Sequence, residues 1–171
     1  GRNYFAIGFS NDYGGWELRS ERFKGCSTPK HITTIDNGSD KALAFEGFMD
    51  FLSYLTIKRN DSPTCNIAVL NSVANIQKAV PFLARHRSIY TFLDNDDAGR
   101  KALSEIERLC PQSKVINQSD FYRRHKDLND YLKTFDYPVK VLNNGEALER
   151  AVKELGEDLF HQGVTYAEIR F

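Results

Sequence analysis

Between residues 41 and 117, short apolar segments alternate with longer segments whose apolar residues recur every three or four positions. The short segments are 42–45, 66–70, 88–93 and 114–116, and the longer ones are 48–58, 75–86 and 97–109. Short apolar runs are typical of strands buried on both faces, and the three-to-four spacing is typical of amphipathic helices. Their alternation predicts an α/β fold, with about four mostly parallel strands and helices on both faces of the sheet.

The two ends of the chain follow other patterns. Residues 4–9 and 16–19 read as strands separated by a turn, which predicts a β-rich lead-in. Residues 146–160 predict a helix near the C-terminus. We therefore expect three parts: a lead-in at 1–38, an α/β domain at 39–137 and a helical extension at 138–171.

Composition limits the class of protein. The 23 Lys and Arg balance the 23 Asp and Glu, which argues against a purely electrostatic nucleic-acid binder but not against a local basic face. No apolar run reaches the roughly 18–20 residues of a membrane helix. The three cysteines at 26, 65 and 110 have neither zinc spacing nor an even number. We expect free thiols, a cytoplasmic location and no membrane partner, and the missing initiator Met suggests a piece of a longer protein.

Acidic residues follow the predicted strands at one edge of the sheet. Glu46 follows the first strand, Asp94 and Asp96 follow the third, and Asp127 lies beyond the fourth. Ligands of open α/β sheets bind outside the carboxyl ends of the strands, and hard divalent cations take oxygen ligands. The pattern predicts a site for Mg²⁺ or a similar cation, with metal-assisted phosphoryl transfer as its chemistry. Asp97 opens the third predicted helix, and we expect it to cap that helix.

Three motifs surround these carboxylates: Glu46-Gly47-Phe48-Met49-Asp50, Asp94-Asn95-Asp96-Asp97-Ala98-Gly99-Arg100 and Lys126-Asp127-Leu128-Asn129-Asp130. The first resembles the EGYMD motif of bacterial DNA primases of the DnaG type, and the second resembles their DGDRAGRDA stretch. The third is similar to the KDxNDxL wording of plasmid and phage primases. Together they resemble the TOPRIM signature over about residues 40–135. Residues 5–32 resemble the strand-rich segment that precedes TOPRIM in the primase core.

The resemblance implies a fragment of a DNA primase that joins ribonucleoside triphosphates on a single-stranded DNA template, with a replicative helicase as a further partner. The implied catalytic residues are Glu46, Asp94 and Asp96. The implied ligands of Mg²⁺ or Mn²⁺ are Glu46, Asp50, Asp94, Asp96 and Asp127. The implied nucleotide- or nucleic-acid-binding residues are Lys30, Arg19 and Arg100.

The sequence departs from the family at two positions. Asp97 stands where the family has Arg, which removes a positive charge near the phosphates. Asn129 stands where the chromosomal primases have Asp, which leaves open how a third metal would bind. We expect the isolated fragment to be inactive, because template capture needs upstream parts.

Other functions remain open from the sequence. A Toprim topoisomerase or nuclease has the same carboxylates, and a Toprim module for DNA binding or recombination needs no catalysis. Phosphatases of the haloacid dehalogenase type also use Asp-x-Asp after a strand. They carry that motif on the first strand rather than the third, so we set them aside.

Overall fold

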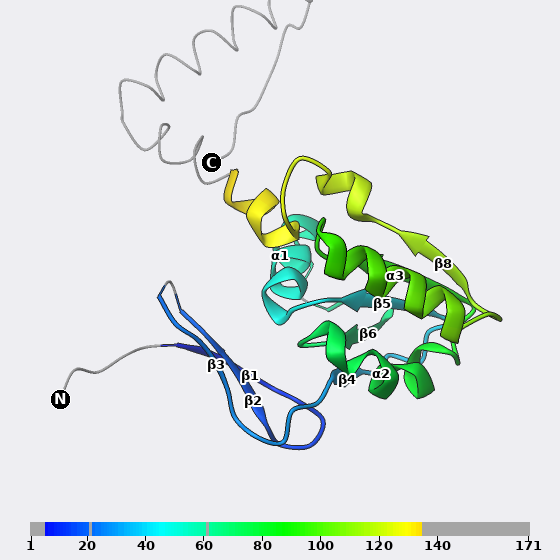
Figure 1. The fold of residues 1–171 in the computed structure, drawn as a ribbon, viewed down its shortest axis with the longest axis horizontal. Helices are drawn as coiled ribbons and strands as arrows, with labels where there is room; N and C mark the ends of the chain where they lie inside the picture. Colours follow the sequence, from blue (N-terminus) through cyan, green and yellow to red (C-terminus); the bar gives the residue numbers. More distant parts are fainter. Residues whose placement is uncertain (1–5, 21, 61, 135–171) are drawn as a thin grey trace, which may run out of the picture. The chain divides into compact units, whose positions relative to one another are not determined.

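The structure is a computed structural model that describes residues 6–20, 22–60 and 62–134 (Figure 1). Its strands are β1 (Ile7–Ser10), β2 (Trp16–Arg19), β3 (Lys24–Cys26), β4 (Thr33–Ile35), β5 (Lys41–Phe45), β6 (Asn66–Val69), β7 (Ser88–Phe92) and β8 (Lys114–Asn117). Its helices are α1 (Phe48–Lys58), α2 (Ile76–Leu83) and α3 (Asp97–Leu109), with 3₁₀ turns at Val73–Asn75 and Ser119–Tyr122. Residues 128–134 are also helical. None of the helices in the described ranges has the length and apolar character needed to cross a membrane.

Two compact units divide the chain at residues 1–131 and 132–171. The first contains both sheets. The helix predicted at 146–160 lies outside the described residues.

The larger sheet has five strands in the order β4-β6-β5-β7-β8. β5, β6, β7 and β8 run parallel, which confirms the predicted α/β sheet, and β4 pairs with β6 in the antiparallel direction. The sequence analysis did not predict β4, because its three residues, Thr-Thr-Ile, form no apolar run. β4 lies within the predicted lead-in at 1–38 but belongs to the larger sheet.

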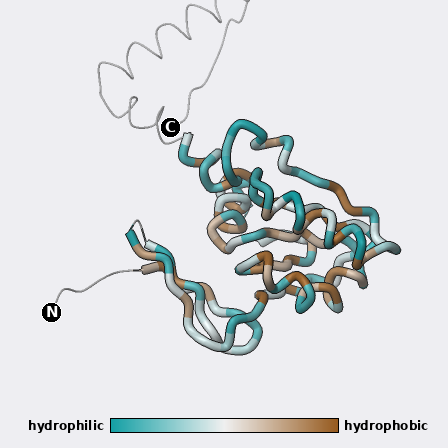
Figure 2. The backbone as a smooth tube through the Cα atoms, viewed as in Figure 1, coloured by the Kyte–Doolittle hydropathy of each residue, from teal (hydrophilic) through white to brown (hydrophobic). Residues whose placement is uncertain are grey.

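Alternate residues along each strand face two hydrophobic cores. On one face, Ala42 and Ala44 of β5 pack with apolar residues of α2 and α3. On the other face, Leu43 and Phe45 pack with α1 and with Tyr122. Helices therefore cover both faces, as predicted, and hydrophobic stretches run through the sheet and these helices (Figure 2). The strand ends remain free to carry polar side chains.

The smaller sheet confirms the β-rich lead-in. β1, β2 and β3 form it with antiparallel pairing. Asn11 shapes the turn between β1 and β2, because its Oδ1 accepts from the main-chain N–H groups of Tyr13 and Gly15 at 3.0 Å each. Gly15 is required there, since a Cβ would lie 2.0 Å from the Pro29 carbonyl oxygen. The Phe9 ring stacks on Phe48 of α1 with 5.2 Å between ring centroids.

Candidate active site at the carboxyl edge of the sheet

Glu46 and Asp94 follow neighbouring strands and lie in contact. β5 and β7 pair in parallel, with Phe45 opposite Phe92, so the chain leaves both strands at the same level. The main-chain N–H of Glu46 donates to the Phe92 carbonyl at 3.2 Å. The main-chain N–H of Asp94 donates to Glu46 Oε2 at 3.2 Å. Strand pairing thus brings the Glu46 carboxylate against the main chain of Asp94, 48 residues away in sequence, and close enough for the charge of Asp94 to act on it.

Asp96 caps α3. Its Oδ1 accepts from the Gly99 N–H at 2.9 Å, which satisfies one of the free N–H groups of the first turn. The expected capping role of Asp97 is therefore wrong, because Asp97 is the first residue of the helix. Its carboxylate instead bonds Arg100 Nη2 at 2.5 Å.

Gly99 lets α3 start close to the end of β7, where Asp94 lies. A Cβ on Gly99 would lie 2.0 Å from the main-chain oxygen of Asp94. Only glycine allows this approach, so the helix start and Asp94 share a fixed spacing.

Asn95 joins the second motif to the third. Its main-chain N–H donates to the Lys126 carbonyl at 2.6 Å. Its side-chain Nδ2 donates to the carbonyls of Tyr122 at 3.1 Å and His125 at 3.0 Å. These bonds bring Lys126 to the strand end, where its Nζ lies 3.0 Å from Asp94 Oδ2.

Sequence reasoning gave neither Asn95 nor Lys126 a role. Its available signal was their position, with Asn95 between two site aspartates and Lys126 beside Asp127. The partners of such residues depend on loop geometry, which no local pattern shows.

Asp50 and Asp127 also lie at this edge, and each uses one oxygen on the third motif. Asp50 on α1 is buried, and its Oδ1 accepts from the Asn129 N–H at 3.1 Å. Asp127 Oδ1 accepts from the Asp130 N–H at 2.6 Å, so it caps the helical turn that begins at residue 128. Both predicted ligands thus lie where the first and third motifs meet, and each accepts a main-chain hydrogen bond from the third motif.

The site carries excess negative charge. Burial, followed by the charge of Asp94, raises the pKa of Glu46. Burial, followed by the charge of Asp127, raises the pKa of Asp50 to about 7. Burial also raises the pKa of Asp94, although the Lys126 ammonium opposes that rise. The hydrogen bond to Asp94 in turn raises the pKa of Lys126. Burial and mutual repulsion disfavour the ionised form of these carboxylates, and a bound cation would favour it.

The carboxylates do not form a ready-made metal cage. Within residues 6–20, 22–60 and 62–134, no three Asp, Glu, His or Cys side chains are grouped closely enough to hold a metal ion. Their oxygens still match the ligand chemistry of Mg²⁺, which usually takes one or two carboxylates together with waters and substrate phosphates. The donor set therefore fits such a cation.

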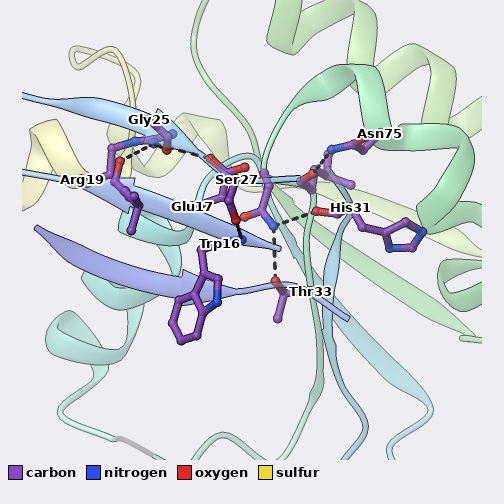
Figure 3. Close-up of polar contacts among 11 residues, drawn as sticks. Trp16, Glu17, Arg19, Gly25, Ser27, His31, Thr33 and Asn75 are labelled. Carbon is purple, nitrogen blue, oxygen red and sulfur yellow. Dashed lines mark hydrogen bonds and ion pairs between the residues drawn. The ribbon is translucent and has the colours of Figure 1, made fainter. Parts of the chain in front are cut away.

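The predicted nucleotide-binding residues occupy different environments. Arg19 Nη1 donates to the carbonyls of Leu18 at 2.8 Å and Gly25 at 3.2 Å, and it pairs with Glu17 at 3.5 Å (Figure 3). Its guanidinium also lies over the Phe48 ring. These contacts tie Arg19 to the small sheet and to α1, and its nucleotide role stays a prediction.

Lys30 and Arg100 are both exposed. The Lys30 carbonyl accepts from Lys78 Nζ at 2.7 Å, so α2 holds this segment while the Lys30 side chain reaches solvent. Arg100 lines a small pocket together with Asp94, Asn95 and Gly99. Arg100 is thus near the site carboxylates, although Asp97 neutralises part of its charge.

The loop after β6 also reaches this edge. Asn71 adopts a left-handed backbone conformation, with φ of 60°. Its Nδ2 donates to the His31 carbonyl at 3.0 Å and to Thr33 Oγ1 at 3.2 Å (Figure 3). Asn71 therefore connects the Lys30 segment to the sheet.

A sequence profile described as Toprim-like matches residues 43–132, more than half of the 171 residues. The chain belongs to the Toprim-like family. This match contains Glu46, Asp94, Asp96 and the third motif. The fold agrees, since this chain resembles the primase fragment of the bacteriophage T7 primase-helicase protein with a TM-score of 0.56 at 19% identity. That likeness covers 79% of this chain and 60% of the T7 chain.

The two ends match other profiles. Residues 1–28 match a domain of unknown function, and residues 105–171 match the adenosine deaminase profile. Adenosine deaminase of Haemophilus ducreyi is 51% identical over 45 residues, which are 26% of this chain and 13% of that enzyme. Adenosine deaminase of Clostridium perfringens is 52% identical over 44 residues, again 26% and 13%. The chain thus spans about an eighth of the length of these relatives.

Proposed function

We propose that this Toprim-like domain carries the metal-dependent site of a DNA primase, which joins ribonucleoside triphosphates on single-stranded DNA. The observation that carries the proposal is the contact between Glu46 and Asp94 at the ends of two parallel strands, with the third motif anchored against them through Asn95 and Lys126. Three motifs worded like those of primases meet at this one edge. The T7 likeness supports the fold that such a site needs.

Asp94 and Glu46 would hold Mg²⁺ or Mn²⁺, and Asp96, Asp127 and Asp50 would complete the negative field around it. A bound divalent cation would neutralise the charge of the phosphates and polarise the phosphorus–oxygen bond. Glu46, whose pKa is raised by burial and by Asp94, would accept the proton of the attacking hydroxyl. Lys30, Arg100 and Arg19 would provide positive charge to the nucleotide and template.

The other readings receive less support. A topoisomerase also needs a nucleophilic tyrosine on a further domain. The motif Glu46-Gly47-Phe48-Met49-Asp50 resembles that of primases. A module that only binds DNA would gain nothing from half-buried carboxylates that repel one another. The adenosine deaminase similarity covers 13% of those enzymes and supports no proposal of deaminase activity for this chain.

The variant Glu46→Gln tests the proposal in the full protein. We expect it to abolish nucleotide joining, a loss of at least about 100-fold, because proton transfer and metal charge are both affected. Binding of single-stranded DNA should stay within about twofold, since phosphate contacts come from Lys and Arg. Primer synthesis and a DNA-binding titration measure the two effects.

Lys30→Ala provides the contrasting variant. It should raise the KM for the nucleotide because it removes a cation from the triphosphate, and it should leave metal binding unchanged. If Glu46→Gln abolishes DNA binding while the fold persists, or if the wild type makes no oligonucleotide with Mg²⁺ or Mn²⁺, the primase proposal is wrong. The second result would favour the DNA-binding module.

A further inference from the structure

Lys126 is a cation built into the carboxylate cluster. Its Nζ lies 3.0 Å from Asp94 Oδ2. Among the described residues, it is the Lys or Arg that pairs with one of the five carboxylates predicted to bind metal. Its charge also acts on Glu46. The ammonium therefore lies where the negative field of the site is concentrated.

The two partners differ in exposure to solvent. The Asp94 side chain is 12% exposed, whereas the Lys126 side chain is 64% exposed. The main chain at Lys126 is held separately, because its carbonyl accepts from the Asn95 N–H at 2.6 Å. The long lysine side chain can thus leave Asp94 without loss of the backbone anchor, while Asp94 stays in place.

The same oxygen cannot serve both cations fully. A divalent cation on Asp94 and an ammonium at 3.0 Å from Asp94 Oδ2 would repel each other, since like charges a few ångströms apart interact strongly even near a protein surface. A divalent cation on Asp94 would therefore weaken or displace the ion pair with Lys126. This also accounts for the open arrangement of the carboxylates in the described residues, where the ammonium supplies part of the missing positive charge.

We propose that Lys126 holds Asp94 in the metal-free protein and competes with the divalent cation for it, so that Lys126 sets the metal affinity of the site. The inference rests on the proposed function, because it takes Asp94 as a metal ligand. Lys126 is a positioning residue in this role: it keeps the ligand carboxylate at the strand end before the metal arrives.

Mn²⁺ titrations of the 171-residue chain test the competition, with free Mn²⁺ measured by electron paramagnetic resonance. Lys126→Met should lower the Kd for Mn²⁺ about fivefold or more, because it removes an ion pair worth roughly 1 kcal/mol. Lys126→Arg, which keeps the charge, should stay near the wild-type Kd. Lys114→Met removes the same charge from exposed Lys114 at the opposite end of β8, and it should change the Kd less than twofold.

The outcomes separate the two proposals. Equal Kd values for the wild type and Lys126→Met, or weaker binding by Lys126→Met, overturn the competition but leave the metal site standing. If neither the wild type nor any variant binds Mn²⁺, both proposals are wrong. Binding by Lys126→Met but not by the wild type supports the competition. Lys126→Gln carries the same expectation as Lys126→Met, and circular dichroism confirms the fold of each variant.

Discussion

Asp50 is an acidic residue with a structural partner and a buried environment. It accepts a hydrogen bond from the Asn129 N–H at 3.1 Å. Its surroundings contain the carboxylates of Asp127, Asp94 and Glu46. Burial and these charges raise its pKa to about 7, so the folded protein binds a proton at Asp50 that the unfolded chain releases near pH 4. The stabilising contribution of Asp50 is therefore complete below about pH 4 and is lost as pH rises through about 7.

Asp50→Asn should remove this part of the pH dependence. The amide oxygen can still accept from Asn129, while the charge is absent at every pH. We expect a melting temperature several degrees above that of the wild type at pH 8 and close to it near pH 4, because each pKa unit corresponds to about 1.4 kcal/mol. Thermal melts without metal from pH 4 to 8 measure the slope. The variant should keep a smaller slope, because the pKa values of Glu46 and Asp94 are also raised. A slope equal to that of the wild type would contradict the raised pKa of Asp50.

At this scale, the sequence identified the acidic residues but not their partners. Glu46 and Asp94 could be placed together because strand ends share an edge. The capping role went to Asp97 rather than Asp96, since both stand near the helix start and only the chain path decides which carboxylate faces the Gly99 N–H. The Lys126–Asp94 pair was missed for the same reason.

The elements show why Asn95 matters to the site. Its side chain donates to two carbonyls in the segment between the 3₁₀ turn at Ser119–Tyr122 and the third motif. Asn95→Ala would leave both carbonyls without this donor, at a cost of about 1–3 kcal/mol. We expect this loss in urea unfolding and a weaker Mn²⁺ affinity. Gln112 is exposed, and Gln112→Ala should change the stability by less than about 0.5 kcal/mol. An equal effect of both variants would contradict a stabilising role for the Asn95 hydrogen bonds.

β7 contains a buried hydroxyl with an unmet hydrogen bond. Thr91 Oγ1 is buried and has no hydrogen-bond partner within the described part of the chain. Thr91→Val keeps the branched shape and removes the polar atom, so it should stabilise the protein by about 1 kcal/mol. Thr34→Val removes a hydroxyl that donates to Asp12 at 3.0 Å and should not stabilise. Urea unfolding compares them, and destabilisation by Thr91→Val would show that the hydroxyl is satisfied.

The long periodic elements were predictable. The bounds of α1 and α3 agree with their helical spacing, and the four parallel strands follow their apolar runs. β3 and β4 were missed, because neither three-residue strand contains an apolar run. β3 pairs with the preceding strand β2, and β4 pairs with the distant strand β6. α2 ends at Leu83, three residues before the end that its apolar spacing suggested.

For the whole molecule, one fold brings residues from three distant segments to one edge of a sheet. The Toprim-like match covers these segments, and the small antiparallel sheet packs Phe9 against α1. We propose that this edge binds a divalent cation. A ligand that binds only the folded state adds RT ln(1 + [L]/Kd) to its stability, about 2.7 kcal/mol at 100 times the Kd.

The most direct test is the melting temperature of the wild-type chain with and without millimolar Mn²⁺. We expect Mn²⁺ to raise it by several degrees, because it relieves repulsion among Glu46, Asp94 and their neighbours. Asp94→Asn should lose most of this rise, whereas Asp97→Asn, which changes an exposed carboxylate on the same segment, should keep it. No rise in the wild type, or an equal rise in Asp94→Asn, would contradict the metal site.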